Sequence, residues 1–162
     1  MTSWDRPAVA HWDFPRSATG IGVLVEAGGA LGVEAGAILR GVGLSPAELA
    51  TPDLLVAPAQ ELAAIRNLCA AAGDRPALAA EVGAAYRLTT FGILGYALLS
   101  SPTLRDVIAM TLRFIDLSYI FSAFGVEATG DRIVVRLGGA ALPEDVREFL
   151  VDRDLFAIDS VL

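Results

Sequence analysis

The sequence predicts a mainly helical α+β domain with a small antiparallel β-hairpin. Three observations support this fold class. Apolar residues recur at helical spacing through most of the chain after residue 18, whereas the alternating pattern typical of strands is clear only near residues 126–137. The length of 162 residues and the hydrophobic fraction of 54% suit one domain with a sizeable core.

Helices separated by Gly and Pro are expected in the first hundred residues. The apolar pattern over residues 19–39 predicts helix that is interrupted at Gly28 and Gly32. Pro58 fits the first turn of another helix, where its missing N–H is not needed, and Gly73 ends that helix. Two shorter helices are expected next, one carrying Leu78, Val82 and Tyr86 and one from Phe91 to Leu99.

A central buried helix is predicted over about residues 103–122. Either Ser101, which precedes Pro102, or Thr103 with Asp106 can cap it, and the sequence leaves both options open. The charged residues of this helix fall within one arc of roughly 100°. Because so narrow a polar face leaves the other sides apolar, we expect the protein to cover the helix on nearly all sides. These charged residues are Arg105, Asp106, Arg113 and Asp116.

The only clear β signal follows this helix. Residues 126–129 and 132–137 flank Gly130-Asp131, a pair that suits a two-residue hairpin turn. A last helix is expected from Pro143, with acidic residues in its first turn. Its apolar pattern still continues at Val161-Leu162, so we expect the chain to be a fragment of a longer protein.

The composition excludes most catalytic chemistry. All twelve basic residues are Arg, so Lys-dependent Schiff bases and the phosphate-binding loop that needs Lys are absent. One Cys, Cys69, and one His, His11, are too few for a disulfide or a zinc site within one chain. We therefore expect no enzyme activity, no cofactor and no metal.

The charge and hydropathy patterns limit the partners. The net charge of −7 argues against a nucleic-acid surface on this chain. The longest apolar stretch, residues 21–39, contains Glu26 and Glu34, so a membrane-spanning helix is not expected. No signal peptide pattern follows Met1, and a cytoplasmic location is expected.

Residues 1–17 differ from the rest of the chain. They contain both Trp residues, Trp4 and Trp12, and show neither helical nor strand periodicity. We expect a leader that is flexible or that docks through its aromatic side chains. The domain proper is expected over residues 18–162.

A ligand pocket beside the central helix is one interpretation of its small hydroxyl side chains. Thr111, Ser118 and Ser122 share a narrow arc and could fix a polar group of a ligand. The alternative is that these hydroxyls bond to helix carbonyls one turn earlier. Combined with the nearby aromatic residues, the interpretation gives a candidate site of Tyr96, Thr111, Phe114, Ser118 and Phe121.

Arg153 is a second feature of interest, because it lies between apolar positions of the last helix. A buried guanidinium needs a carboxylate partner, from the protein or from a ligand. We expect a structural salt bridge or exposure rather than a ligand contact.

A longer motif resembles a known family. Residues 88–104 read LTTFGILGYALLSSPTL and are followed by Arg113-Phe114. This segment resembles the N-terminal effector-binding, arabinose-binding-like region of AraC-type bacterial transcriptional regulators, and the resemblance covers about residues 20–162. Further matches in the same order are Gly41 to Ser45, Thr51 to Asp53, Gly73-Asp74, Gly130-Asp131 and Leu142-Pro143.

The resemblance implies a function that composition alone does not give. Such regions sense small-molecule effectors and form homodimers, and DNA is bound by a C-terminal pair of helix-turn-helix motifs that this chain lacks. No ligand-binding motif of the family transfers residue by residue. We therefore expect a small-molecule-sensing and dimerisation domain of a transcriptional regulator, with a ligand-free protein-interaction and dimerisation module as the alternative.

Overall fold

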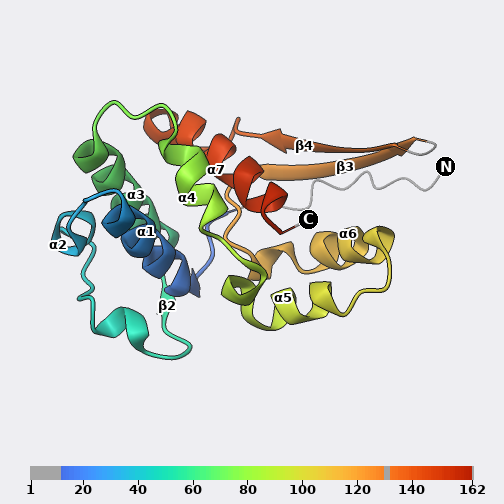
Figure 1. Cartoon of the computed structure of the whole chain (residues 1–162), viewed down its shortest axis with the longest axis horizontal. Helices are drawn as coiled ribbons and strands as arrows, with labels where there is room; N and C mark the ends of the chain where they lie inside the picture. The colour runs from blue at the N-terminus through green and yellow to red at the C-terminus, as the bar shows by residue number, and fades with distance from the viewer. Residues whose placement is uncertain (1–11, 130–131, 162) are drawn as a thin grey trace.

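A computed structural model describes residues 12–129 and 132–161 of the chain. Figure 1 shows a helical half, built from α1 to α4 and α7, beside a smaller half that contains a β-hairpin and the helices α5 and α6. The helices are α1 (Thr19–Ala30), α2 (Ala35–Ile38), α3 (Pro58–Ala72), α4 (Leu78–Ala84), α5 (Gly92–Leu99), α6 (Leu104–Arg113) and α7 (Arg147–Asp159). This confirms the predicted mainly helical α+β class.

Two antiparallel strand pairs complete the described fold. The expected hairpin is present as β3 (Ala123–Thr129) and β4 (Arg132–Gly138), with Val126 opposite Val135. The predicted turn residues, Gly130-Asp131, lie outside the described residues. A second pair, which the sequence did not predict, joins β1 (Arg16–Ser17) to β2 (Leu55–Val56).

Short 3-10 turns link several of these elements. They are η1 (Glu48–Ala50), η2 (Leu88–Phe91), η3 (Ile115–Leu117) and η4 (Glu144–Val146). Pro143 precedes η4, which leads directly into α7, so the last helical segment begins close to its expected position. Gly73 ends α3 with a φ of 67°, a backbone conformation that glycine adopts without steric cost.

The main hydrophobic core lies in the helical half. Ile21 and Leu24 of α1, Ile65 of α3, Val82 of α4 and Leu150 of α7 have no measurable exposure. The backbones of α4 and α7 lie in close contact, because a Cβ atom on Gly83 would lie 2.6 Å from the Arg153 carbonyl oxygen. The sequence therefore places a residue without a side chain at this close helix crossing.

The smaller half has a separate apolar cluster. Ile108 of α6, Ile115, Ile120 and the hairpin residues Phe124 and Val126 are buried together. Leu112, Val135, Leu137 and Ile158 pack against this cluster. The hairpin, α6 and the end of α7 thus share one apolar environment.

The predicted central buried helix over residues 103–122 is wrong in length and in position. α6 ends at Arg113 and lies on the outside of the molecule, with Ile108 as its only buried residue (Figure 1). Thr103 provides the N-cap, since its side chain accepts a hydrogen bond from the Asp106 amide. Of the two capping options, the structure therefore uses the second.

The helix does not continue to residue 122 because the side chains of residues 119–121 alternate between the main core and the smaller apolar cluster. In residues 118–122, Tyr119 and Phe121 join the main core, whereas Ile120 joins the smaller cluster. An α-helix cannot send neighbouring side chains to opposite sides in this way, whereas extended backbone can. Ser118 accordingly adopts extended backbone angles.

Candidate functional site

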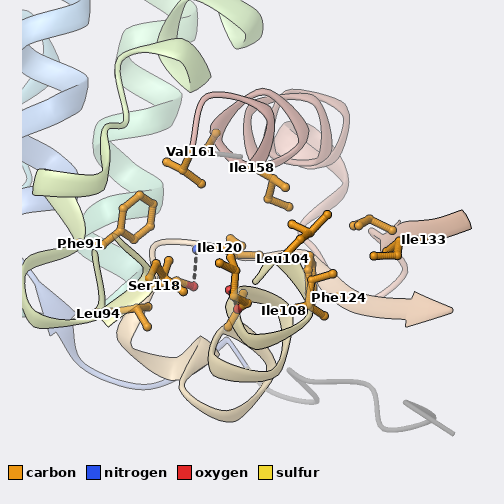
Figure 2. Close-up of a pocket in the computed structure, with 15 residues that line it drawn as sticks. Phe91, Leu94, Leu104, Ile108, Ser118, Ile120, Phe124, Ile133, Ile158 and Val161 are labelled. Atoms are coloured by element: carbon orange, nitrogen blue, oxygen red, sulfur yellow. Dashed lines mark hydrogen bonds between the residues drawn. The ribbon is translucent and has the colours of Figure 1, made fainter. Parts of the chain in front are cut away.

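An apolar cavity lies between α5, α6, the hairpin and α7. Its volume is about 200 Å³. Figure 2 shows the side chains that surround it, contributed by five segments between residues 91 and 161. The lining residues are Phe91, Leu94, Leu98, Leu104, Val107, Ile108, Thr111, Ser118, Ile120, Phe124, Ile133, Val135, Ala157, Ile158 and Val161.

α6 presents one face of its surface to this cavity. Leu104, Val107, Ile108 and Thr111 line it at spacings of three and four residues. This spacing places side chains on a single face of an α-helix, while the other faces of α6 meet solvent. The helix therefore forms an outer wall of the cavity.

Two hydroxyl groups are the polar side-chain groups of the lining. The Thr111 hydroxyl donates to the Val107 carbonyl oxygen at 2.9 Å, as the simpler sequence interpretation expected. The Ser118 hydroxyl oxygen accepts from the Ile120 amide at 3.3 Å. Within the described residues, the hydrogen of Ser118 has no acceptor, so this group can still donate one hydrogen bond.

The structure brings together only two of the five predicted site residues. Thr111 and Ser118 both line the cavity. Tyr96 lies outside the lining, with 74% of its surface exposed, and Phe114 is also partly exposed beyond it. Phe121 is buried on the opposite side of the 118–122 segment, in the main core.

The cavity residues that the sequence reasoning missed are mostly aliphatic. The spacing of Leu104, Val107 and Ile108 on one helix face was available as a signal, but it was interpreted as burial of a whole helix. The contributions of Ile133 and Ile158 depend on tertiary packing between distant segments. Local sequence patterns do not contain that information.

A buried cluster of charges lies behind the cavity wall. Arg16 of β1, Glu61 of α3 and the neighbours Arg153 and Asp154 of α7 are each at most 3% exposed. The Arg153 Nε lies 2.8 Å from Asp154 Oδ1, and its Nη1 lies 3.8 Å from Glu61 Oε1. The Arg16 Nε lies 3.7 Å from Glu61 Oε2. Two positive and two negative groups thus compensate one another, and the expected salt bridge of Arg153 is present.

Aromatic and hydroxyl groups complete this charge cluster. Arg153 donates to the Tyr86 hydroxyl at 2.8 Å. The centroid of the Phe121 ring lies 4.1 Å from the Arg16 Cζ and 5.5 Å from the Arg153 Cζ. Such cation–π contacts are stronger when water is excluded.

Burial has a marked effect on the titration of Glu61. Loss of hydration raises the pKa of this carboxyl from 4.5 to about 7, although Arg153 and Arg16 oppose the shift. Burial lowers the pKa of Arg153, but Asp154, Tyr86 and Glu61 outweigh it, so that pKa is raised. Arg153 is therefore a permanent cation, while Glu61 titrates near neutral pH.

Asp154 connects the charge cluster to the cavity wall. Its Oδ2 accepts hydrogen bonds from the amides of Phe121 at 2.9 Å and Ser122 at 2.8 Å. Ser118 and Ile120, in the same segment, line the cavity. Residues 118–122 therefore line the cavity with the side chains of Ser118 and Ile120. The backbone of the same segment is hydrogen-bonded to Asp154 of α7.

Comparison with known protein families agrees with the sequence motif. Residues 32–162 match the family described as the arabinose-binding N-terminal domain of AraC transcription regulators. The chain belongs to this family. As a regulator domain, the AraC-type chain is not an enzyme.

Two relatives of the AraC-type domain are uncharacterized HTH-type transcriptional regulators. They are Mb1430 of Mycobacterium bovis and Rv1395 of Mycobacterium tuberculosis. Each is 34% identical to the chain over 136 residues, which cover 84% of the chain and 40% of the relative. The chain thus spans less than half the length of these relatives. No solved structure matches the AraC-type domain significantly.

The part of the AraC-type domain that the structure describes offers neither a metal site nor a single membrane-spanning helix. No cluster of three or more His, Cys, Asp or Glu side chains could hold a metal ion there. No single described helix is long and apolar enough to span a membrane. The segments Leu78–Ala84 and Leu88–Leu99 reach that length and composition only together, and they are bent by 72°.

Proposed function

We propose that this chain is the small-molecule-sensing domain of an AraC-type transcriptional regulator and that the cavity beside α6 is its effector site. Family membership supports a regulatory role. The observation that supports sensing at this site is an apolar cavity of about 200 Å³ lined by α5, α6, the hairpin and α7. DNA binding would belong to another part of the regulator.

The effect of a bound effector would pass through residues 118–122. A ligand in the cavity presses on Ser118 and Ile120, and this segment is tied to α7 by the two hydrogen bonds to Asp154. α7 also lines the cavity through Ala157 and Ile158. A ligand shifts such a system only if its affinity differs between two arrangements of these elements.

Thermal unfolding with a panel of metabolites tests this proposal. A ligand at one hundred times its Kd stabilises a protein by about 2.7 kcal/mol, which raises the Tm of a domain of this size by roughly 5–10 °C. Val107→Trp, which fills the cavity from α6, should abolish the shift. Ala109→Trp, on the exposed side of the same helix, should retain it. If no compound raises the Tm of the unmodified chain, effector sensing at this cavity is wrong.

A ligand-free dimerisation module is the second candidate, and an exposed apolar surface favours it. On and beside α5, the exposed fractions are 81% for Ile93, 74% for Tyr96 and 65% for Leu99. Apolar surface of this kind often marks a protein interface. Sedimentation of the chain with and without Ile93→Glu and Leu99→Glu tests this candidate, since a dimer formed through α5 should dissociate to monomers.

A further inference from the structure

We infer that the effector of this cavity is an uncharged, mostly hydrocarbon molecule with a single hydrogen-bond acceptor, such as a small aryl or alicyclic ketone, and not a sugar. This inference rests on the proposed function and specifies its ligand. It is carried by the chemistry of the lining and by the hydrogen bonds that the two hydroxyls already make.

The size of the cavity sets the size of the ligand. A dry protein cavity of about 150 Å³ can hold benzene. At about 200 Å³, this cavity has room for one ring with a short substituent. Thirteen of the fifteen lining residues have hydrocarbon side chains, so most of the ligand surface would meet carbon atoms.

The lining has no group that would compensate a charge on the ligand. It contains neither Arg nor His, and neither Asp nor Glu. The buried Arg153 is occupied by Asp154, Glu61 and Tyr86 on the other side of the 118–122 segment. An isolated carboxylate or ammonium group would lose its hydration without a partner, which strongly disfavours binding.

A sugar would bind poorly in this cavity for a related reason. Each hydroxyl that leaves water without a hydrogen-bond partner costs about 1–3 kcal/mol. A pentose carries several hydroxyls, whereas the side chains of the lining offer only Thr111 and Ser118. Since the Thr111 hydroxyl already donates to Val107, the remaining donor is that of Ser118. One acceptor on the ligand, such as a carbonyl oxygen, therefore matches the site.

Methyl NMR of the whole chain with four matched probes tests this inference. The probes are ethylbenzene, acetophenone, benzoate and L-arabinose. They are similar in size and represent a hydrocarbon, a ketone, a carboxylate and a polyol. The cavity reporters are the methyl groups of Ile108, Ile120, Ile133 and Ile158. Ile21 and Ile65 in the main core serve as control methyls. Ethylbenzene and acetophenone should shift the reporters, and benzoate and arabinose should leave them unchanged.

Ser118→Ala tests whether the Ser118 hydroxyl donates a hydrogen bond to the acceptor of the ligand. We expect this variant to weaken acetophenone binding roughly three- to tenfold while changing ethylbenzene binding less than about twofold. The ratio of the two affinities cancels any general effect of the substitution on the cavity. An equal loss for both probes would contradict the role assigned to Ser118.

Two variants test whether the methyl chemical-shift changes arise from binding in the cavity. Val107→Trp should abolish binding of both apolar probes, and Ala109→Trp should preserve it. Leu104→Trp provides a second filling variant from a more exposed position of the lining, should Val107→Trp disturb the control methyls.

The outcomes separate this inference from the proposed function. If arabinose or benzoate shifts the cavity methyls and Val107→Trp abolishes that shift, the ligand class is wrong while sensing at this site stands. If neither apolar probe reaches the cavity methyls, the ligand class is likewise wrong. If the metabolite panel raises no Tm either, the proposed function falls with it.

Discussion

Asp154 joins three parts of the molecule through one carboxylate. It forms an ion pair with Arg153 and accepts hydrogen bonds from the backbone amides of Phe121 and Ser122. Only 1% of its surface is exposed. Removing one partner of a buried ion pair leaves the other charge uncompensated. The consequences should therefore extend from α7 to the cavity wall.

Asp154→Ala should lower the free energy of unfolding by about 3–5 kcal/mol. Asp152→Ala is the matched control, because Asp152 is exposed on the same helix and should change stability by less than about 0.5 kcal/mol. Urea denaturation of both variants measures the difference. Similar small effects from the two substitutions would contradict the anchoring role of Asp154.

Glu61 should make stability depend on pH. Its pKa is about 7 in the folded chain, above the ordinary 4.5, so between these values the folded chain holds a proton that the unfolded chain has released. This contribution is fully present below about pH 4.5 and is lost as the pH rises through 7. The charged and titratable groups that interact with Glu61 are Arg16, Arg153, Asp154 and Tyr86.

The comparison of the natural chain with Glu61→Gln measures this effect. As the pH rises from 4.5 to 7, the natural chain should lose stability relative to the variant, since Gln does not titrate. Denaturation midpoints at several pH values report the difference. A difference that stays constant, or one that changes in the opposite direction, would show that the folded-state pKa of Glu61 is not raised.

At the scale of elements, the crossing of α4 and α7 leaves no room for a side chain at Gly83. A Cβ atom at Gly83 would lie 2.6 Å from both the Arg153 carbonyl oxygen and the Phe156 Cβ. Gly83→Ala should therefore push the helices apart and cost roughly 1–3 kcal/mol. Gly22→Ala in α1 meets no atom within 4 Å and should instead gain up to about 1 kcal/mol. Thermal unfolding of the two variants compares these opposite signs.

The elements also show what sequence patterns can and cannot predict. Pro58, Gly73 and the hairpin strands were predictable because local backbone chemistry determines them. The prediction for residues 103–122 failed because it treated apolar content as helix. The amides of Phe121 and Ser122 bond to a carboxylate 32 or more residues away, and no local pattern contains that partner.

The candidate site was predictable to a similar, partial degree. Thr111 and Ser118 were identified because small hydroxyls among apolar residues are unusual. Tyr96 and Phe121 were selected as nearby aromatics, but one is exposed and the other faces the charge cluster. That a buried Arg153 needs a carboxylate partner can be predicted from electrostatics alone. That Glu61 connects Arg153 to Arg16 can be seen only in the folded structure.

At the scale of the whole molecule, the two halves differ in how they are held. The helical half has a large continuous core, whereas α6 contributes one buried residue and faces a cavity. Segments with few buried contacts open at lower free energy than the core. Amide hydrogen exchange should therefore be faster in α6 than in α3, and uniform protection of the two helices would contradict this difference.

The proposed function requires that a ligand enters the cavity. Intermolecular nuclear Overhauser effects on the chain with acetophenone locate the bound molecule. We predict contacts from its protons to the methyl groups of Ile120 and Ile158, which both line the cavity. Contacts only to exposed Ile93, or none at saturating acetophenone, would place the ligand elsewhere and contradict the account.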